Sequence, residues 1–564
     1  MLVFYDFEVF RNDWMVVCIE DNDQETIITN DQPRLVEFYN KHINDIWVGY
    51  NTRHYDRYIL KGLILGLNPY KISKWIIEGN QGWEFSRSFY KVKLYDFDIK
   101  TTMHSLKELE AFMGFNIQET TVDFDLDRSL TQDEINETIK YCRHDVQQTM
   151  QVFLQRKEEF ESHIKLIKMF DLDIGNVSKT KAQISAVILD AQRAERNDEF
   201  NLTFPPTLKL DKYSEVLEWY KNPENHNYES KLELEVDSVN HIFGWGGVHG
   251  AIPNYCGSGI YLNMDVASLY PALMLNYNFL SRNVKNPEKY RNIRDERLRL
   301  KQLKDPNQAP LKIVLNGTYG ASKAKFNSLY DPLSANNVCV AGQLLLLDLI
   351  EKLEGIGCLI QTNTDGIIYK VNQLSDIDVI KSIAKEWEIR TGLDLEYSTH
   401  VKIIQKDVNN YIIINEDGSY KSKGAYVKKL HLLDNDLPIV NKALVNYFVK
   451  NIPVEDTISE CKDLIMFQKV KKISYKYAYG MYGDQKLSEK CLRVFASVNV
   501  DDPGVFKIKI EDGVEHKAKI ENTPEHCYID NSDVRERQID DRLDINWYIN
   551  IANERIKDFF GIYY

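Results

Sequence analysis

The most constraining feature of the sequence is the alternation, at its N-terminal end, between short apolar runs and longer helical stretches. Four runs rich in β-type residues lie within the first fifty residues, separated by polar turns: LVFYDFEVF, WMVVCIE, ETIIT and IWVGYN. Helical stretches follow near 54–66 and 105–114, and a long helix is predicted over about 132–163, behind the capping sequence that begins at Thr131. This pattern predicts an α/β unit over residues 1–165.

The chain has 564 residues, far more than this one unit can contain, so we expect several domains. Residues 166–242 have the composition of a connector, with Pro-Pro at 205–206 and a polar stretch at 221–230. Beyond them we predict, in order, a Gly-rich boundary at 243–259, a strand running into a helix at 259–274, a helical hairpin at 286–304 and 310–322, an apolar helix at 338–354, and a strand pair around 357–371. From about 400 onward, strands and helices alternate.

The charge of the chain must be weighed by its distribution. The formal net charge is −14, whereas a protein that binds nucleic acid neutralises phosphates with Lys and Arg. Such proteins nevertheless concentrate acid at metal sites and base along a groove, and lysines do crowd one C-terminal region: Lys421, Lys423, Lys428, Lys429, Lys469, Lys471, Lys472 and Lys476. A solvated lysine face explains this crowding equally well. The net charge therefore does not exclude a nucleic-acid partner.

Eight cysteines lie singly, without a CxxC pair or a Cys/His cluster. This usage indicates a reducing compartment and argues against a structural zinc site or an iron–sulfur cluster. No basic segment precedes the apolar N-terminus, and the most apolar later run, at 338–350, is 13 residues long with Gln343 and Asp348 inside it. We therefore expect no signal peptide, no membrane span and a cytoplasmic protein.

Two acidic residues, Asp265 and Asp365, lie 100 residues apart, each at the end of an apolar run. A single Asp in that position is most often a turn former or a cap, so the neighbouring residues must decide. Two such acids can share a pair of Mg²⁺ ions about 4 Å apart, as phosphoryl transfer from a nucleoside triphosphate requires.

The neighbouring residues resemble the motifs of family B DNA polymerases. DVASLYP at 265–271 matches motif A (DxxSLYP), KIVLNGTYG at 312–320 matches motif B (KxxxNxxYG), and QTNTDG at 361–366 stands in place of motif C (YxDTDS). The resemblance implies that Asp265 and Asp365 are metal ligands and that Tyr270 is a steric gate against ribonucleotides. It further implies that the nucleotide is contacted by Lys312, Ser268, Leu269, Asn316 and Tyr319, and the DNA by Gly320.

Spacing and substitutions bear on this resemblance. The motif B residues Lys312, Asn316, Tyr319 and Gly320 recur at helical spacing and so share one helix face, although an ordinary amphipathic helix has the same spacing. In motif C, Asn363 replaces the family's first aspartate, which removes one negative charge, and Gly366 replaces its serine. We expect activity to survive, because Asp365 occupies the position of the main ligand, with consequences for metal affinity and fidelity.

Three partial matches complete the polymerase motifs. Arg297 and Lys301 resemble residues of the family's fingers that grip the triphosphate, but they also fit a solvated helix face paired with Asp295 and Glu296. Gly246 and Gly247 resemble the YxGG segment, without its aromatic residue, where bare backbone would approach the template. Lys406 and Tyr411 stand for the KxY motif that holds the primer terminus, with altered spacing.

A second set of acids lies in the first unit. Asp6 and Glu8 alternate with aromatic residues, so on a strand both carboxylates face one side; Tyr141 and Asp145 are four residues apart, on one helix face. With Asn51 and Asp56, these residues resemble the Exo I (DxE), Exo II (Nx₂₋₃[FY]D) and Exo III (YxxxD) motifs of proofreading exonucleases with an RNase H-like fold. The resemblance implies that Asp6, Glu8, Asp56 and Asp145 bind metal, that Tyr141 orients the attacking water and that Asn51 contacts DNA. Asp96 and Asp98 are rivals for the place of Asp56.

Taken together, the motifs predict an α/β and α+β multidomain protein, with an RNase H-like exonuclease followed by a right-hand polymerase. The expected divisions are exonuclease at 1–165, connector at 166–242, linking segment and first part of the palm at 243–284, short helical fingers at 285–325, palm at 326–400, and remaining palm and thumb at 401–564. The expected function is template-directed DNA synthesis from dNTPs with 3′–5′ proofreading, using two Mg²⁺ ions per site, for which Mn²⁺ can substitute. Expected partners are primer–template DNA, single-stranded DNA in the exonuclease site, and a helicase or clamp.

Two alternatives are a nuclease whose polymerase half has decayed, which the change at Asn363 suggests, and a non-catalytic nucleic-acid-binding factor. The DxE motif begins at residue 6, without the domain that precedes it in cellular relatives, which resembles phage or plasmid replicases working in a bacterial cytoplasm. The intervals from Asp265 to Lys312 and from Tyr319 to Asp365, 47 and 46 residues, leave no room for the insertions of protein-primed polymerases. We therefore expect extension of a nucleic-acid primer.

Overall fold

The computed structural model describes residues 1–424 and 426–562, and the chain divides into two compact units. Unit 1 comprises Met1–Lys179, Leu430–Val440 and Ile458–Ile549. Unit 2 comprises Thr180–Lys429, Asn441–Thr457 and the chain from Asn550 onward. Each unit is therefore assembled from segments that are far apart in the sequence, and the C-terminal lysines are divided between them, Lys421–Lys429 in unit 2 and Lys469–Lys476 in unit 1.

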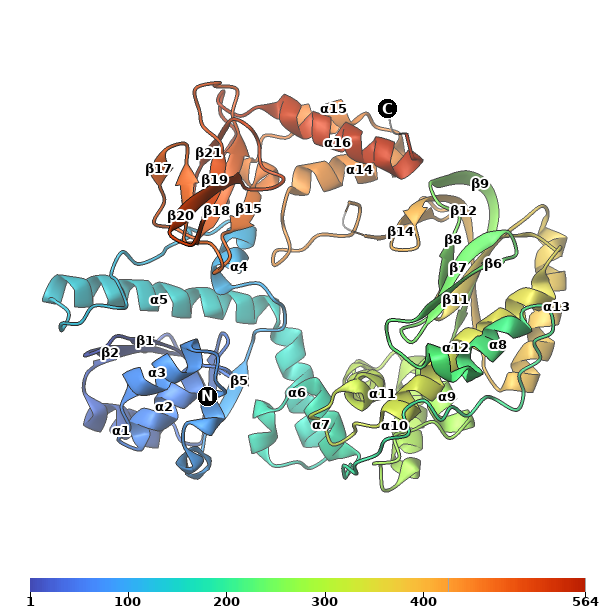
Figure 1. Ribbon diagram of the computed structural model, residues 1–564, viewed down its shortest axis with the longest axis horizontal. Helices are drawn as coiled ribbons and strands as arrows, with labels where there is room; N and C mark the ends of the chain where they lie inside the picture. Colours follow the sequence, from blue (N-terminus) through green and yellow to red (C-terminus); the bar gives the residue numbers. More distant parts are fainter. Residues whose placement is uncertain (425, 563–564) are drawn as a thin grey trace. The chain divides into compact units, whose positions relative to one another are not determined.

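Unit 1 is built on a five-stranded mixed sheet (Figure 1). Its strands in spatial order are β3 (Glu25–Thr29), β2 (Trp14–Glu20), β1 (Leu2–Val9), β4 (Ile46–Gly49) and β5 (Tyr95–Asp98). The pairs among β1, β2 and β3 are antiparallel, whereas β4 runs parallel to β1 and to β5. This mixed sheet is what the α/β pattern of the first unit predicted.

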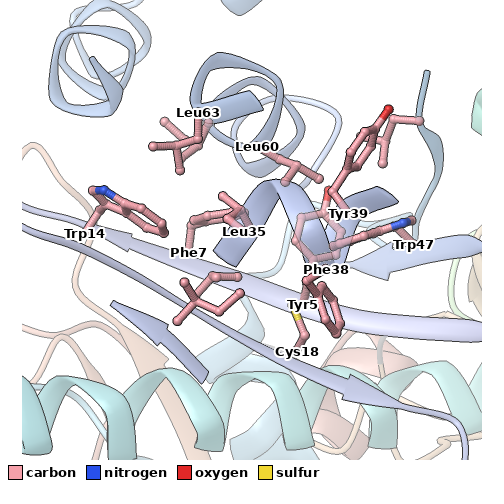
Figure 2. Close-up of a cluster of buried hydrophobic side chains, with 14 of the residues drawn as sticks. Tyr5, Phe7, Trp14, Cys18, Leu35, Phe38, Tyr39, Trp47, Leu60 and Leu63 are labelled. Atoms are coloured by element: carbon pink, nitrogen blue, oxygen red, sulfur yellow. The ribbon is translucent and has the colours of Figure 1, made fainter. Parts of the chain in front are cut away.

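Helices cover both faces of this sheet. Because successive side chains of a strand point to opposite faces, alternate residues of β1 pack against different helices. Tyr5 and Phe7 pack with α1 (Gln32–Lys41), α2 (Asp56–Ile64) and α3 (Pro69–Ile77), in the cluster that Figure 2 shows around Phe38, Trp47 and Leu60. Phe4 points to the other face, where it packs with α4 (Leu106–Met113) and α5 (Gln132–Gln155). Asp6 and Glu8 share the parity of Phe4, so they belong to the α4–α5 face.

The long helix expected over 132–163 is two helices. α5 begins behind Thr131, whose side chain accepts a hydrogen bond from the Glu134 amide in a capping box, and it ends at Gln155. α6 (Lys157–Met169) follows after one residue, Arg156. Arg156 is buried and donates to the Ile99 carbonyl at the end of β5, so a tertiary contact interrupts a helix that the sequence pattern alone would continue.

The C-terminal segment of unit 1 forms two smaller sheets. One has the order β15 (Lys469–Lys472), β18 (Cys491–Ala496), β21 (Cys527–Ile529), and the other β17 (Gln485–Lys486), β16 (Tyr479–Tyr482), β19 (Val505–Glu511), β20 (Val514–Lys519). The first sheet packs on α4, and the fully buried Arg493 of β18 donates to the carbonyls of Ala111 and Phe115. Arg493 thereby ties β18 to the C-terminal end of α4 and to the residues that follow it.

Unit 2 is built on a nine-stranded antiparallel sheet. In spatial order the strands are β14 (Tyr420–Lys423), β13 (Asn410–Ile414), β12 (Leu395–Asp407), β9 (Tyr255–Val266), β11 (Gly366–Val371), β10 (Cys358–Asn363), β8 (His249–Ala251), β7 (Val239–Gly244) and β6 (Lys231–Val236). The predicted strand pair is β10–β11. It lies beside β9, which carries Asp265.

Helices complete unit 2, and the predicted helical hairpin is present as α10 and α11. The helices wholly within unit 2 are α7 (Lys181–Ile188), α8 (Ser214–Lys221), α9 (Leu269–Asn276), α10 (Pro287–Gln302), α11 (Gln308–Lys323), α12 (Pro332–Leu353) and α13 (Leu374–Thr391), whereas α15 (Val454–Glu460) begins in unit 2 and ends in unit 1. α14 (Pro438–Lys450) and α16 (Ile545–Phe560) each have residues in both units. The expected α/β and α+β multidomain fold is confirmed.

Among the described residues, one helix, α12, is long and apolar enough to cross a membrane by length and composition. Its most apolar 18-residue window is 94% buried within the protein. Gln343 and Asp348, the polar residues inside it, are buried and hydrogen-bonded, Gln343 to the Gly244 carbonyl and Asp348 to Arg390. α12 is therefore packed as a core helix.

Candidate active sites

The two acids of unit 2 are brought together by strand register. β9 and β11 pair antiparallel with Gly366 directly opposite Asp265, and Asp365 immediately precedes Gly366 in the tight turn that joins β10 to β11. The Val266 amide donates to the Asp365 carbonyl at 2.7 Å, which fixes the turn beside β9. Two residues a hundred positions apart therefore present their carboxylates at the same place on the sheet.

Gly366 is required by this arrangement. A Cβ built at this position would lie 2.1 Å from Asp265 Oδ1 and 3.0 Å from the Met264 carbonyl oxygen. A side chain at 366 would thus displace the Asp265 carboxylate. The departure from the family's serine is explained locally, because this backbone leaves room only for glycine.

The electrostatic surroundings of Asp265 are mixed. Burial raises the pKa of Asp265, Asn263 Nδ2 donates to its Oδ2 at 2.6 Å and lowers that pKa, and the nearby charge of Asp365 raises it again. Lys421 of β14 lowers the pKa of Asp265, and Glu396, directly opposite it on β12, raises it. Asn363 donates to Gln361 Oε1 at 3.3 Å. Oxygen donors of this kind suit Mg²⁺, so the pair fits the expected metal.

Sequence reasoning missed Glu396. It lies beside Asp265 only because β12 pairs with β9 in this register, and no motif marks it. Lys301 Nζ contacts Glu396 Oε1 at 3.1 Å, so this member of the predicted fingers pair has an acidic partner beside Asp265, although both side chains of the ion pair are more than half exposed.

Arg297, in contrast, does not lie on a solvated helix face. It is buried, and its Nη1 donates to Ser268 Oγ at 3.2 Å, while Asp295 pairs with Arg294 and Glu296 with Arg299. Ser268 has φ of 52° and precedes α9, so the motif A chain turns sharply after the strand that carries Asp265. Arg297 Nε has no hydrogen-bond partner among the described residues, which leaves a buried cationic donor directed toward motif A.

The motif A and motif B aromatic residues meet. The Tyr270 and Tyr319 rings lie 4.1 Å apart at an interplanar angle of 39°, which joins α9 to α11. Tyr319 is half-buried, whereas Lys312, Asn316 and Gly320 are exposed along α11. Leu269 is buried in the core behind Tyr270. The shared helix face that the spacing predicted is present.

Two of the partial matches lie near Asp265 and Asp365. Gly247 has φ of +139°, and a Cβ there would lie 3.3 Å from Thr364 Oγ1 in the turn that carries Asp365. Burial raises the pKa of Tyr411, and the charges of Asp265 and Asp365 raise it further; Lys423 Nζ lies 6.0 Å from the centre of the Tyr411 ring. Gly246 is exposed with open space at its Cβ position.

Lys406 has partners on α16 and in the segment that follows β14. It forms an ion pair with Asp558 of α16, and its Nζ lies 5.5 Å from the centre of the Tyr426 ring. Lys421 is instead the lysine whose charge reaches Asp265.

The acids of unit 1 converge from three elements. Asp6 and Glu8 stand on β1, Asp56 is the first residue of α2 and Asp145 lies on α5. Ligand atoms of Asp6, Glu8 and Cys142 all lie within 4.8 Å of one another, and the Phe7 amide donates to Asp56 Oδ1 at 3.2 Å. The predicted set is therefore assembled by a strand and two helices.

Glu8, Asp56 and Asp145 are buried and Asp6 is half-buried, and the four acids repel one another. Burial, followed by the charges of the neighbouring carboxylates, raises the pKa of Asp6 and of Glu8 well above the usual range. Burial raises the pKa of Asp56 to about 8 and that of Asp145 to about 6. Carboxylates gathered in this way have oxygen ligands to offer and little countercharge, which fits divalent cations.

Lys107 of α4, which sequence reasoning missed, supplies the nearby cation. Its Nζ forms an ion pair with Asp145 Oδ1, contacts the fully buried Glu110 at 3.1 Å and lies 4.6 Å from the centre of the Tyr141 ring. The pKa of Asp145 is lowered by Lys107, although burial outweighs this effect. The pKa of Tyr141 is raised by burial and then by the charges of Asp145 and Glu8. Only tertiary packing brings α4 to α5.

The rivals of Asp56 have structural partners. The Asp98 carboxylate accepts hydrogen bonds from the amides of Asn51 at 2.9 Å and Arg53 at 3.1 Å. Asp96 accepts from the Tyr5 hydroxyl at 3.1 Å and lies 3.8 Å from Arg57 Nε. Asn51 Oδ1 accepts from Lys100 Nζ at 3.2 Å. Asp98 therefore holds the segment that precedes Asp56, and Asp96 lies between Tyr5 of β1 and Arg57 of α2.

Comparison with known proteins supplies relatives for part of the chain. No family model matches it. It is 24% identical over 332 residues to DNA polymerase 1 of Saccharolobus solfataricus, covering 50% of this chain and 34% of that protein. It is 23% identical over 316 residues to DNA polymerase 1 of Sulfurisphaera ohwakuensis, covering 48% of this chain and 34% of that protein. It is 26% identical over 260 residues to DNA polymerase 1 of Aeropyrum pernix, covering 38% of this chain and 27% of that protein.

The aligned part thus spans about a third of the length of these relatives. Among solved structures, the family B DNA polymerase from the hyperthermophilic archaeon Pyrobaculum calidifontis superposes with a TM-score of 0.41 and 15% identity, over 100% of this chain and 78% of that one. The curated relatives are archaeal proteins named DNA polymerase 1, and the predicted resemblance of this chain to family B DNA polymerases is confirmed.

Proposed function

We propose that unit 2 carries out template-directed DNA synthesis from dNTPs. The observation that carries this proposal is the register of β9 and β11, which places Gly366 opposite Asp265 and so brings Asp265 and Asp365 together inside the motif A and motif C sequences. The similarity to proteins named DNA polymerase 1 supports it. The substrates would be primer–template DNA and the four dNTPs.

The residues around the acid pair have separate tasks in this proposal. Asp265 and Asp365 would hold Mg²⁺, and metal bound at such sites lowers the pKa of the attacking oxygen and stabilises the leaving group. Tyr270, held by Tyr319, would exclude a ribose 2′-hydroxyl. Lys312 would contact the triphosphate, with the buried Arg297 holding Ser268 and Leu269 in place. Gly247, Gly320 and Tyr411 would face the DNA.

We further propose that unit 1 is a 3′–5′ exonuclease that proofreads. The specific observation in its favour is the convergence of Asp6, Glu8, Asp56 and Asp145 in a buried cluster. The four carboxylates would hold the same kind of ion, and the Tyr141 hydroxyl would orient the attacking water. Lys107 would fix the Asp145 carboxylate on the side of α4.

Primer extension on paired and mispaired termini tests both proposals. The protein should extend a paired primer with dNTPs and Mg²⁺, and should remove a mispaired 3′ nucleotide before it extends. Degradation without extension would identify a nuclease with a decayed polymerase half. Binding without either reaction would identify a non-catalytic replication factor.

The motif intervals support priming by nucleic acid. α9, α10 and the start of α11 fill the chain between Asp265 and Lys312, and the rest of α11, α12 and β10 fill it from Tyr319 to Asp365. Neither interval holds a separate subdomain. Efficient initiation on a protein hydroxyl, or unaided displacement through long duplex, would contradict this proposal. We also propose that a helicase or a clamp assists this enzyme. We further propose that it is a phage enzyme that works in a bacterial cytoplasm.

A further inference from the structure

A cavity of about 330 Å³ opens beside the segment that links Asn51 to Asp56 in unit 1. We call it the Trp83 pocket; Arg53, His54, Tyr58, Gly82 and Trp83 are among the residues that line it. Its volume lies at the lower end of the range for pockets that hold small ligands. It takes in no residue of the acid cluster itself.

The walls of the Trp83 pocket are built by specific contacts. Gly82 lies on the face of Tyr58, because a Cβ at position 82 would come within 2.3 Å of Tyr58 Cδ2. Trp75 Nε1 donates to the Gln81 carbonyl at 3.1 Å, and Asn80 Nδ2 donates to the Trp75 carbonyl at 3.1 Å. The loop that carries Trp83 is therefore held against α2 and α3.

The lining combines aromatic and basic side chains without an acid. Trp83 is 61% exposed, an unusual position for so large an apolar side chain. Arg53 and His54 form no side-chain hydrogen bond or ion pair with the residues that the structure describes. Two cationic or ionisable donors and an exposed indole are thus left facing the same cavity.

Aromatic side chains beside basic ones are what single-stranded nucleic acids require. Bases stack on the rings regardless of sequence, while the cations follow the phosphates. The position suits such a strand, because Arg53 lies three residues before Asp56, a span of at most about 11 Å between Cα atoms. Asp98 holds the Arg53 amide at 3.1 Å, so this span is fixed to the sheet that carries the acids.

We propose that the Trp83 pocket holds one unpaired base of a DNA single strand whose 3′ end lies at the acid cluster. The base would stack on Trp83, with Tyr58 and Gly82 as the floor of the pocket, and Arg53 would contact the adjoining phosphate. This proposal rests on the proposed exonuclease function, since that function supplies the strand. It assigns to the residues between α3 and β5 a task outside the exonuclease motifs.

The test is an abasic scan of binding. The full-length protein carrying Asp6→Ala and Glu8→Ala is titrated with short single-stranded oligodeoxynucleotides in which one position at a time, counted from the 3′ end, lacks its base. One position should show about tenfold weaker binding, because its base–aromatic stacking is lost. Trp83→Ala should abolish the difference between positions, and Trp83→Phe should keep it.

Two further variants separate the pocket from general effects. Tyr90→Ala removes another exposed aromatic residue, 79% exposed and outside the pocket, and should leave the scan unchanged. Arg53→Ala should weaken binding to all oligonucleotides alike and reduce the salt dependence, as expected for loss of a phosphate contact. Melting curves of each variant verify folding.

A scan with no position-specific loss, or one that Trp83→Ala leaves unchanged, overturns the proposal. So does loss of position dependence in Tyr90→Ala. Hydrolysis of a single strand by the unsubstituted protein is measured separately. If the protein hydrolyses the strand but no abasic position weakens binding more than the others, only the pocket proposal is wrong. If one position weakens binding in a Trp83-dependent way but the protein does not hydrolyse the strand, the pocket proposal is supported and the exonuclease proposal is wrong.

Discussion

The two acid clusters solve the same problem of gathering carboxylates in different ways. In unit 1, Asp6, Glu8, Asp56 and Asp145 come from a strand and two helices and are largely buried, so their pKa values rise. In unit 2, Asp265 and Asp365 lie on one antiparallel sheet, and Asp365 is exposed in a turn. Mutual repulsion in a dry site is much more costly than at a wet surface. The first cluster should therefore depend on bound cations for stability, and the second mainly for activity.

The largest expected effect is separation of the two activities. Asp6→Ala with Glu8→Ala should abolish degradation and leave extension largely intact, and Asp265→Ala should do the reverse, because the acids belong to different units. Primer extension and single-strand degradation, assayed on the same preparations, check this. Loss of both activities in a folded single-site variant would show that the two clusters are not independent.

Gly366→Ala should reduce extension by about a hundredfold. Its Cβ would meet Asp265 Oδ1, and displacement of a reacting group by about 1 Å can cost that much. The rate of correct dNTP incorporation measures the effect, and degradation by unit 1 should not change. Gly355→Ala is a control elsewhere in unit 2, because its Cβ would meet no atom within 4 Å, although its φ of +83° predicts a small loss of stability. Equal losses in both variants would mean that general destabilisation of unit 2, not displacement of the Asp265 carboxylate, limits activity.

Tyr270→Ala should raise ribonucleotide incorporation by tenfold or more, equivalent to relief of a clash of about 1.4 kcal/mol. Tyr270→Phe keeps the ring beside Tyr319 and should keep the discrimination. Incorporation of matched dNTP and rNTP pairs measures the ratio. Unchanged sugar selectivity in Tyr270→Ala would remove Tyr270 as the gate and weaken the assignment of unit 2.

The smallest expected effect concerns stability and tests the comparison itself. With divalent cations chelated, Asp6→Asn should raise the melting temperature by a few degrees, because removing one of four crowded like charges is worth on the order of 1 kcal/mol and each kcal/mol shifts Tm by about 2–4 °C. Asp365→Asn, at an exposed site, should change it little.

Added Mg²⁺ should stabilise the unsubstituted protein and stabilise Asp6→Asn less. Differential scanning calorimetry with and without chelator measures both variants. If Asp365→Asn matched Asp6→Asn in either condition, the distinction between a buried and an exposed cluster would not hold.

Much of the site could be predicted because the informative residues are local in sequence. The motifs containing Asp265, Asp365, Asp6 and Asp145 are short, and their spacing fits the strands and helices that form. The capping box at Thr131 likewise predicted the start of α5. The end of that helix could not be predicted, because Arg156 breaks it through a contact with Ile99, fifty-seven residues away.

The sequence by itself determined which residue types stand on which face of each element, since the periods of strands and helices follow from backbone geometry. It thereby placed Asp6 with Glu8, and Lys312 with Asn316. Only the tertiary structure decided which elements meet: that Glu396 lies opposite Asp265, that Lys107 reaches Asp145, and that the segment around Arg493 packs on α4. Such neighbours depend on strand register and helix packing between distant segments, which burial of the whole core selects and no local pattern records.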